Sequence, residues 1–161
     1  VLCMYIAIKN VSTPEDIALT AQLGQEIWHE HYDSLIGPDQ VDYMLEHFQS
    51  VPAITEQIAH GTTYLLAYWD DEPAGYCAFK PEEHKMFLSK IYVRRTYRKL
   101  GIASVMFDQV QKRHWERVVS TSLSTNTTAV LLRLTKSWGS QLRMKRSPRG
   151  AKEVQLLIII P

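Results

Sequence analysis

The spacing of hydrophobic positions divides this chain into a helical first part and a strand-rich middle part. Residues 4–10 (MYIAIKN) alternate between apolar and polar side chains and predict a first strand. Apolar residues then recur three or four apart after Thr13, which fits a helix N-cap because a proline follows it. This pattern predicts a long helix that ends at the IGPD break of residues 36–39. Two shorter helices are expected, over residues 41–48 and 52–60.

From residue 62 onward the pattern is that of strands separated by turns. Residues 62–70 (TTYLLAYWD) and 74–80 (AGYCAFK) flank a DDEP turn, and residues 86–93 (MFLSKIYV) follow a PEEHK turn. A helix is predicted over residues 102–114 (IASVMFDQVQKRH). A strand, several helices, an antiparallel run of strands and a long helix make an α+β fold with a central sheet.

Composition places the chain among ordinary globular proteins and adds an expected compartment. It has 161 residues, of which 45% are hydrophobic and 22% charged, so residues 1–161 are expected to form a single domain. The two cysteines, Cys3 and Cys77, are too few for a disulfide framework, which favours a cytoplasmic location. We expect no membrane partner, because no apolar run reaches ~18 residues and VLCMYIAIK lacks the layout of a signal peptide. Met4 is a candidate start residue.

Charge is distributed unevenly along the chain. Residues 1–111 contain 8 Lys and Arg against 15 Asp and Glu, whereas residues 112–161 contain 10 against 2. A basic tail of this kind is typical of proteins that bind nucleic acid or an anionic surface. A second explanation, given below, needs no such partner.

The segment RTYRKLGIAS (residues 95–104) carries the most specific chemical signal. Arg98, Gly101 and Ala103 fit R-x-x-G-x-A directly after a predicted strand and at the start of a predicted helix. Small residues let a ligand approach the backbone, and the first N–H groups of a helix bind phosphate oxygens together with the helix dipole. The neighbouring basic side chains add positive charge. The alternative interpretation is a solvated basic turn.

This loop resembles the acetyl-CoA loop of the GNAT superfamily of N-acetyltransferases, whose pattern is Q/R-x-x-G-x-G/A. The order of elements before the loop also matches, so the resemblance covers about residues 4–112. It implies a central mixed, mostly antiparallel sheet flanked by helices, with acetyl-CoA as co-substrate. Lys99-Leu100 replaces the family's frequent Gly-Lys. The cofactor-binding residues implied are Ile91, Tyr92, Val93, Arg98, Lys99, Leu100, Gly101, Ile102, Ala103 and Ser104.

The resemblance also implies direct attack of an amine on the thioester, with a backbone N–H near Ile91 or Tyr92 stabilising the oxyanion. A base is still needed for the proton of the amine. Because residues 86–93 contain no carboxylate, the candidate catalytic residues are Glu30, His31 and Tyr32. An exposed helix end without a catalytic role is the alternative. No metal site is expected, since HEH lacks the H-E-x-x-H spacing. Cys77 is expected to lie in the core.

The acceptor is expected to be a primary amine of a small molecule or peptide. Six acidic residues on the first two helices would suit a cationic acceptor such as a polyamine: Glu26, Glu30, Asp33, Asp39, Asp42 and Glu46. A homodimer stays open, and no nucleic-acid partner is expected. The rival interpretation is a non-catalytic acyl-CoA-binding module, or a degenerate GNAT-like module used for protein contacts.

Residues 113–161 do not match the family, which continues with a strand, an Asn-containing turn, a helix with a Tyr general acid and a Gly-Phe pair. Two interpretations stay open. One is an ordinary divergent C-terminal part. The other is a frameshift, in the gene or in its recorded translation, that begins near residues 111–114. In the shifted frame the codons of Trp138-Gly139 must encode Gly, and Asn, Tyr and Gly-Phe can then fall at the family's spacing.

Overall fold

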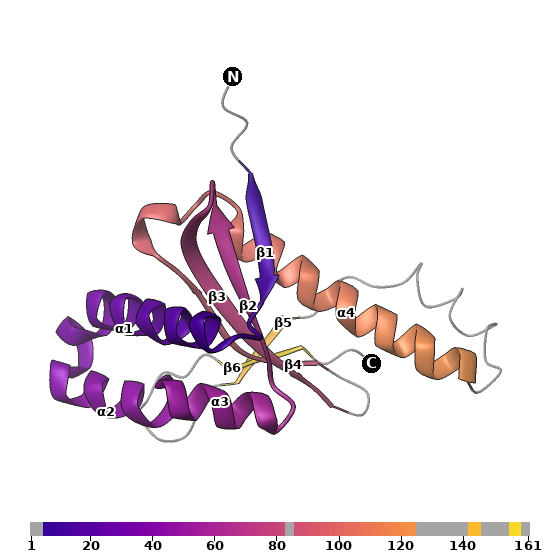
Figure 1. The fold of residues 1–161 in the computed structure, drawn as a ribbon, viewed down its shortest axis with the longest axis horizontal. Helices are drawn as coiled ribbons and strands as arrows, with labels where there is room; N and C mark the ends of the chain where they lie inside the picture. Colours follow the sequence, from indigo (N-terminus) through magenta and orange to yellow (C-terminus); the bar gives the residue numbers. More distant parts are fainter. Residues whose placement is uncertain (1–4, 83–85, 125–141, 146–154, 159–161) are drawn as a thin grey trace.

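The fold combines helices with one antiparallel sheet, as expected for an α+β protein (Figure 1). The computed structural model describes residues 5–82, 86–124, 142–145 and 155–158. The elements in chain order are β1 (Ile6–Asn10), α1 (Pro14–Ile36), α2 (Pro38–Phe48), α3 (Val51–Ala59), β2 (Thr63–Trp69), β3 (Glu72–Pro81), β4 (Met86–Val93), the 3-10 turn η1 (Arg95–Tyr97), α4 (Ile102–Ser124), β5 (Leu142–Lys145) and β6 (Gln155–Ile158).

The strands follow the order β1-β2-β3-β4-β6-β5. Each ladder between the described strands is antiparallel, so the parallel component of the expected mixed sheet does not occur in this part of the chain. β6 pairs with β4 from Met86 to Leu88, and the ladder ends there. The second half of β4 therefore extends past β6 toward η1.

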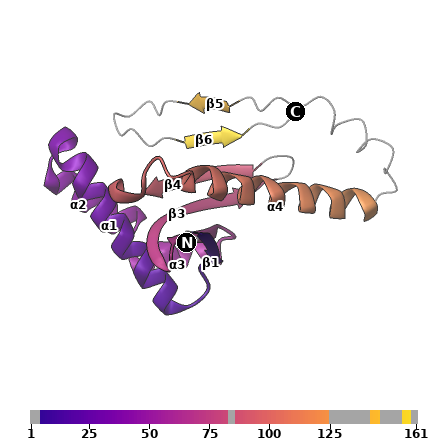
Figure 2. The same cartoon turned by 90° about the horizontal axis from the view of Figure 1, so that it is seen from above.

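Helices cover both faces of the sheet and bury a separate core on each. On one face Ile102, Met106 and Val110 of α4 pack against the strands, and on the other face α1 and α3 pack against β2 and β3. Figures 1 and 2 show α1, α2 and α3 grouped away from α4. Cys77 is fully buried in the α4-side core, which confirms its predicted place. None of the described helices is long and apolar enough to cross a membrane.

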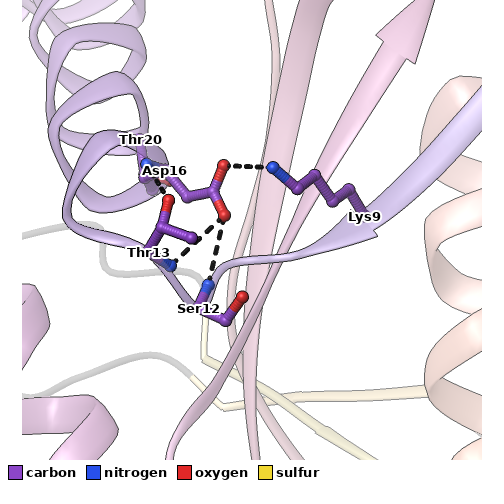
Figure 3. Close-up of polar contacts among 5 residues, drawn as sticks. All are labelled: Lys9, Ser12, Thr13, Asp16 and Thr20. Carbon is purple, nitrogen blue, oxygen red and sulfur yellow. Dashed lines mark hydrogen bonds and ion pairs between the residues drawn. The ribbon is translucent and has the colours of Figure 1, made fainter.

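The start of α1 is tied to β1 by a buried carboxylate (Figure 3). Thr13 is the N-cap, as predicted, and forms a capping box with Asp16. The Asp16 carboxylate, only 4% exposed, accepts hydrogen bonds from the backbone N–H groups of Ser12 and Thr13 and lies 2.7 Å from Lys9 Nζ. This arrangement fixes the direction in which α1 leaves the sheet.

α4 is longer than the predicted helix over residues 102–114. It continues to Ser124, so the predicted end at His114 was wrong. The physical reason is that no Gly or Pro occurs between Gly101 and Gly139, and the Ser and Thr residues after His114 lower helix propensity without preventing a helix. The sequence pattern also missed the short strands β5 and β6. Most residues that carry the frameshift argument lie outside the described ones.

A β-bulge interrupts the β3–β4 ladder. Ala78 pairs with Lys90 and Phe79 with Leu88, so Ser89 is an extra residue in β4. Leu88 and Ile91 both pack against the α4-side core. In a regular strand two residues that are three positions apart would face opposite sides of the sheet, and the extra residue Ser89 is what places them on the same side. Lys90 consequently faces α2 and α3.

Candidate functional site

A cleft of about 390 Å³ opens between α1, the second half of β4 and the loop that follows β4. Small-ligand sites typically have volumes of roughly 300–1,000 Å³. The residues that line it are Ile27, His31, Tyr32, Ile91, Tyr92, Val93 and Arg98. Of these seven, all but Ile27 are residues that the sequence singled out. The structure thus brings two candidate catalytic residues next to four of the predicted cofactor-binding residues.

The remaining predicted residues lie outside this lining. Glu30 is exposed on α1 and does not line the cleft. Lys99 and Leu100 are exposed in the loop, and Ala103 and Ser104 are exposed in the first turn of α4. The side chain of Ile102 is buried in the α4-side core, so only its backbone is suited to contact a ligand.

The loop before α4 has the backbone geometry of a turn that presents N–H groups. Gly101 has φ +82° and Lys99 has φ +66°, both in the left-handed region. The first α4 hydrogen bond of this turn runs from the N–H of Val105 to the carbonyl of Gly101, at 3.1 Å. The N–H groups of residues 102–104 have no carbonyl partner four residues earlier within α4, as at every helix start. The exposed turn is open to an anion.

Two arginines of this loop have different surroundings. The Arg98 side chain lines the cleft and donates from Nε to the carbonyl of Val93 at 3.0 Å. Arg94 donates from Nε to Glu26 at 2.7 Å and from its guanidinium to the carbonyl of Pro73 at 3.1 Å. Its charge is therefore already compensated. Arg94 was one of the basic residues expected to add positive charge next to the loop, and in the structure it is paired with a carboxylate of α1.

Aromatic rings form one wall of the cleft. The Tyr32 ring lies 4.7 Å from the Trp28 ring, and the Tyr92 ring lies 5.9 Å from it. Burial raises the pKa of the Tyr32 phenol above its usual 10.0, and the positive charge of Arg98 opposes that rise. Tyr32 is consequently a neutral hydroxyl near pH 7. Within the described residues Trp28 Nε1 has no hydrogen-bond partner and is buried behind these rings.

A buried lysine supports the strand side of the cleft. Lys90, 6% exposed, donates to the carbonyl of Phe48 at 2.8 Å, to Gln57 Oε1 at 2.8 Å and to the Tyr64 hydroxyl at 2.6 Å. It thereby joins β4 to the end of α2 and to α3. Sequence reasoning missed this residue, although a charged side chain inside an otherwise apolar strand was the available signal.

Three of the six acidic residues noted on α1 and α2 contact basic side chains. Glu26 pairs with Arg94, while Asp33 and Asp42 lie 2.9 Å and 3.2 Å from the two ring nitrogens of His29. No carboxylate is among the described residues that line the cleft. Nor do the described residues contain a group of three or more His, Cys, Asp or Glu side chains that could hold a metal ion.

Comparisons with known proteins agree on one family. The model of the acetyltransferase (GNAT) family matches residues 24–132, which is well over half of the chain and continues past residue 112. The structure of PaiA N-acetyltransferase from Thermoplasma acidophilum in complex with coenzyme A is similar, with a TM-score of 0.67 at 13% identity over 95% of this chain and 96% of that one. A search of curated protein sequences finds no match.

Two further solved structures share the fold. A GCN5-related N-acetyltransferase from Rhodopseudomonas palustris has a TM-score of 0.59 at 14% identity, over 94% of this chain and 90% of that one. A GNAT family acetyltransferase from Brucella melitensis in complex with acetyl-CoA has a TM-score of 0.51 at 16% identity, over 70% of each chain. At these identities the likeness shows the fold alone.

Proposed function

The chain belongs to the acetyltransferase (GNAT) family, and from this premise we propose that it transfers the acetyl group of acetyl-CoA to a primary amine of a small molecule or peptide. The cleft carries the proposal. It unites the α1 residues His31 and Tyr32 with the end of β4 and with Arg98, so that a cofactor site and an acceptor site share one opening.

The cofactor would lie along β4 and end at the start of α4. The pantetheine arm would pair with the backbone of residues 91–93, beyond the point where the ladder with β6 ends. The diphosphate would accept hydrogen bonds from the backbone of residues 98–104, helped by the α4 dipole and the Arg98 side chain. The exposed turn at Gly101 and the structures of relatives with coenzyme A or acetyl-CoA support this placement.

The reaction would proceed by direct attack. The neutral amine nitrogen forms a bond to the thioester carbonyl carbon, and the carbon–sulfur bond then breaks with its electron pair leaving on the CoA sulfur. A backbone N–H at Ile91 or Tyr92, just after the bulge at Ser89, would stabilise the negative oxygen formed in between. No protein nucleophile takes part, which agrees with the complete burial of Cys77.

Two protons must move during this reaction. His31 lines the cleft and would accept the proton that the amine loses on attack. Tyr32 is a neutral phenol and hence a poor base, so its role would be to donate a proton to the departing thiolate. Glu30, exposed and outside the lining, would act only through water.

Incubation with isotope-labelled acetyl-CoA and a panel of amines tests the proposal. We expect labelled product from at least one amine and a loss of kcat of about 100-fold in His31→Gln, in line with the usual worth of a general base. His60→Gln is the matched control, because His60 bonds to a carbonyl of its own helix, Glu56, and does not line the cleft. Cofactor binding without transfer to any amine would favour the acyl-CoA-binding module instead.

A further inference from the structure

The part of the cleft left for the acceptor is apolar and aromatic. If the cofactor occupies β4 and the loop at Arg98, as proposed above, the acceptor contacts Ile27, His31, Tyr32 and the ring of Tyr92. Ile27 is 2% exposed and belongs to the core that α1 forms with the sheet. This wall contains an aliphatic side chain, an imidazole and two phenol rings, and no negative charge.

Two carboxylates close to this wall along the chain are bound to other groups, and a third, that of Glu30, is exposed and does not line the cleft. Glu26 lies one residue before Ile27, but its Oε1 is 2.7 Å from Arg94 Nε. Asp33 follows Tyr32, but its Oδ1 is 2.9 Å from His29 Nδ1. Each of these two carboxylates therefore already has a side-chain partner outside the cleft.

We propose that the acceptor is a monoamine with an apolar or aromatic body, and that the cleft discriminates against diamines and polyamines. This inference rests on the proposed acetyl transfer and names its substrate class. The acidic residues noted in the sequence favoured a polyamine, but none of them lines the cleft, and three of the six, Glu26, Asp33 and Asp42, contact basic side chains.

The physical reason is that the reacting nitrogen of an amine becomes neutral, whereas a second amino group of the same molecule stays positively charged. The reacting nitrogen must lose its proton before attack, and contact with apolar and aromatic side chains favours the neutral form. A second ammonium group stays charged, and burial without a carboxylate is costly. A cation–π contact with Tyr32 or Tyr92 offsets only part of that cost. The positive charge of Arg98 in the same cleft repels a second ammonium group and adds to the cost.

The test compares amines of equal length that differ in charge. Hexylamine, 1,6-diaminohexane and 2-phenylethylamine are assayed with acetyl-CoA by release of free thiol. We expect kcat/KM for both monoamines to exceed that of the diamine by about tenfold or more. Competition between hexylamine and the diamine for the complex with coenzyme A, followed by saturation-transfer NMR, gives a binding readout that does not require turnover. We expect saturation of hexylamine signals only.

A matched pair of variants isolates the effect of charge. His31 is exposed and lines the cleft, so both His31→Glu and His31→Gln should fold. The two differ by one negative charge at nearly equal size. We expect His31→Glu to raise the diamine-to-monoamine binding ratio about tenfold over His31→Gln.

The outcomes separate this inference from the proposed function. Equal or stronger binding of the diamine to the wild-type complex, or binding of neither amine, overturns the inference, as does an unchanged ratio in His31→Glu. Preferred binding of hexylamine without any acetyl transfer supports the substrate class and counts against the proposed activity. A failure of acetyl-CoA to raise the melting temperature would count against both, because the acceptor wall is defined by the position of the cofactor.

Discussion

Replacement of Gly75 with alanine would place a methyl group in the β3–β4 ladder where the neighbouring strand leaves no room. A Cβ at Gly75 would lie 2.4 Å from the carbonyl oxygen of Tyr92 and 3.1 Å from the Cα of Val93. Real Cβ atoms essentially never approach another heavy atom within 3.0 Å. The two strands must therefore separate by at least 0.6 Å at this position, the difference between 3.0 and 2.4 Å.

The cost follows from what such a displacement strains. The contact at Gly75 involves backbone, so no side chain can rotate away, and overpacking of this kind costs about 1–3 kcal/mol. Stretching of an adjacent ladder hydrogen bond adds about 1 kcal/mol. We expect Gly75→Ala to lower the free energy of unfolding by about 2–4 kcal/mol. For a domain of this size the melting temperature should fall by about 5–15 °C.

Urea and thermal denaturation measure this loss, and the rise in melting temperature with acetyl-CoA measures binding. Because Tyr92 and Val93 line the cleft, we expect Gly75→Ala to lose most of its response to the cofactor. Gly61→Ala is the control. Gly61 has φ +90° with nothing within 4 Å of an added Cβ, so it should lose only about 1–2 kcal/mol and keep the full response. A Gly75→Ala protein as stable as the wild type would refute the reasoning.

Three other predictions concern single side chains. Asp16→Ala should lower the free energy of unfolding by about 2 kcal/mol, whereas Glu15→Ala, an exposed neighbour, should change it by less than about 1 kcal/mol. The hydrogen bond from the Lys9 ammonium, above all, holds the pKa of the Asp16 carboxyl below the usual 3.8. The stabilisation by Asp16 is therefore complete above pH 3.8 and is lost as the pH falls through the lower pKa of the folded state. In acid titrations the stabilities of wild type and Asp16→Asn should converge below that folded-state pKa. Gly101→Ala should weaken acetyl-CoA binding about tenfold in calorimetry, because φ +82° disfavours any side chain and the turn must shift; unchanged affinity would argue against this anion site. Burial raises the pKa of the Cys77 thiol to about 12, so thiol reagents should label Cys77 in urea and not in the native protein, as mass spectrometry would show.

Local signals in the sequence predicted the helical part of the fold well. Thr13 and the proline after it mark the start of α1, and Gly37 lies at its end, so the helix runs from Pro14 to Ile36 as expected. The reason is that caps and turns depend on residues within a few positions of each other. The loop at Gly101 was predictable on the same grounds.

Contacts between distant segments were not predictable from spacing. Lys90 forms hydrogen bonds to residues of α2, α3 and β2, and no short sequence motif indicates contacts between segments so far apart in the chain. The same holds for the ion pair between Arg94 and Glu26. Glu30, His31 and Tyr32 are consecutive and were predicted to share a role, but Glu30 lies outside the lining while His31 and Tyr32 belong to it, and residue order alone does not distinguish them. For residues 113–161, the intact mass of the protein, 18.6 kDa for the printed sequence, tests the frameshift interpretation.

The bulge at Ser89 gives β4 one residue more than the segment of β3 that it pairs with. Removal of Ser89 by deletion would restore a regular two-residue alternation and leave every side chain from Lys90 to Val93 on its present face, because Ile91 would then lie two positions after Leu88. The deletion would instead remove the local bend and added twist that a bulge gives a strand, directly before the cleft-lining residues Ile91, Tyr92 and Val93. Relatives of this chain that lack a residue at this point should therefore keep the same side chains on each face of β4, and an alignment gap there would mark a straighter strand beside the cleft.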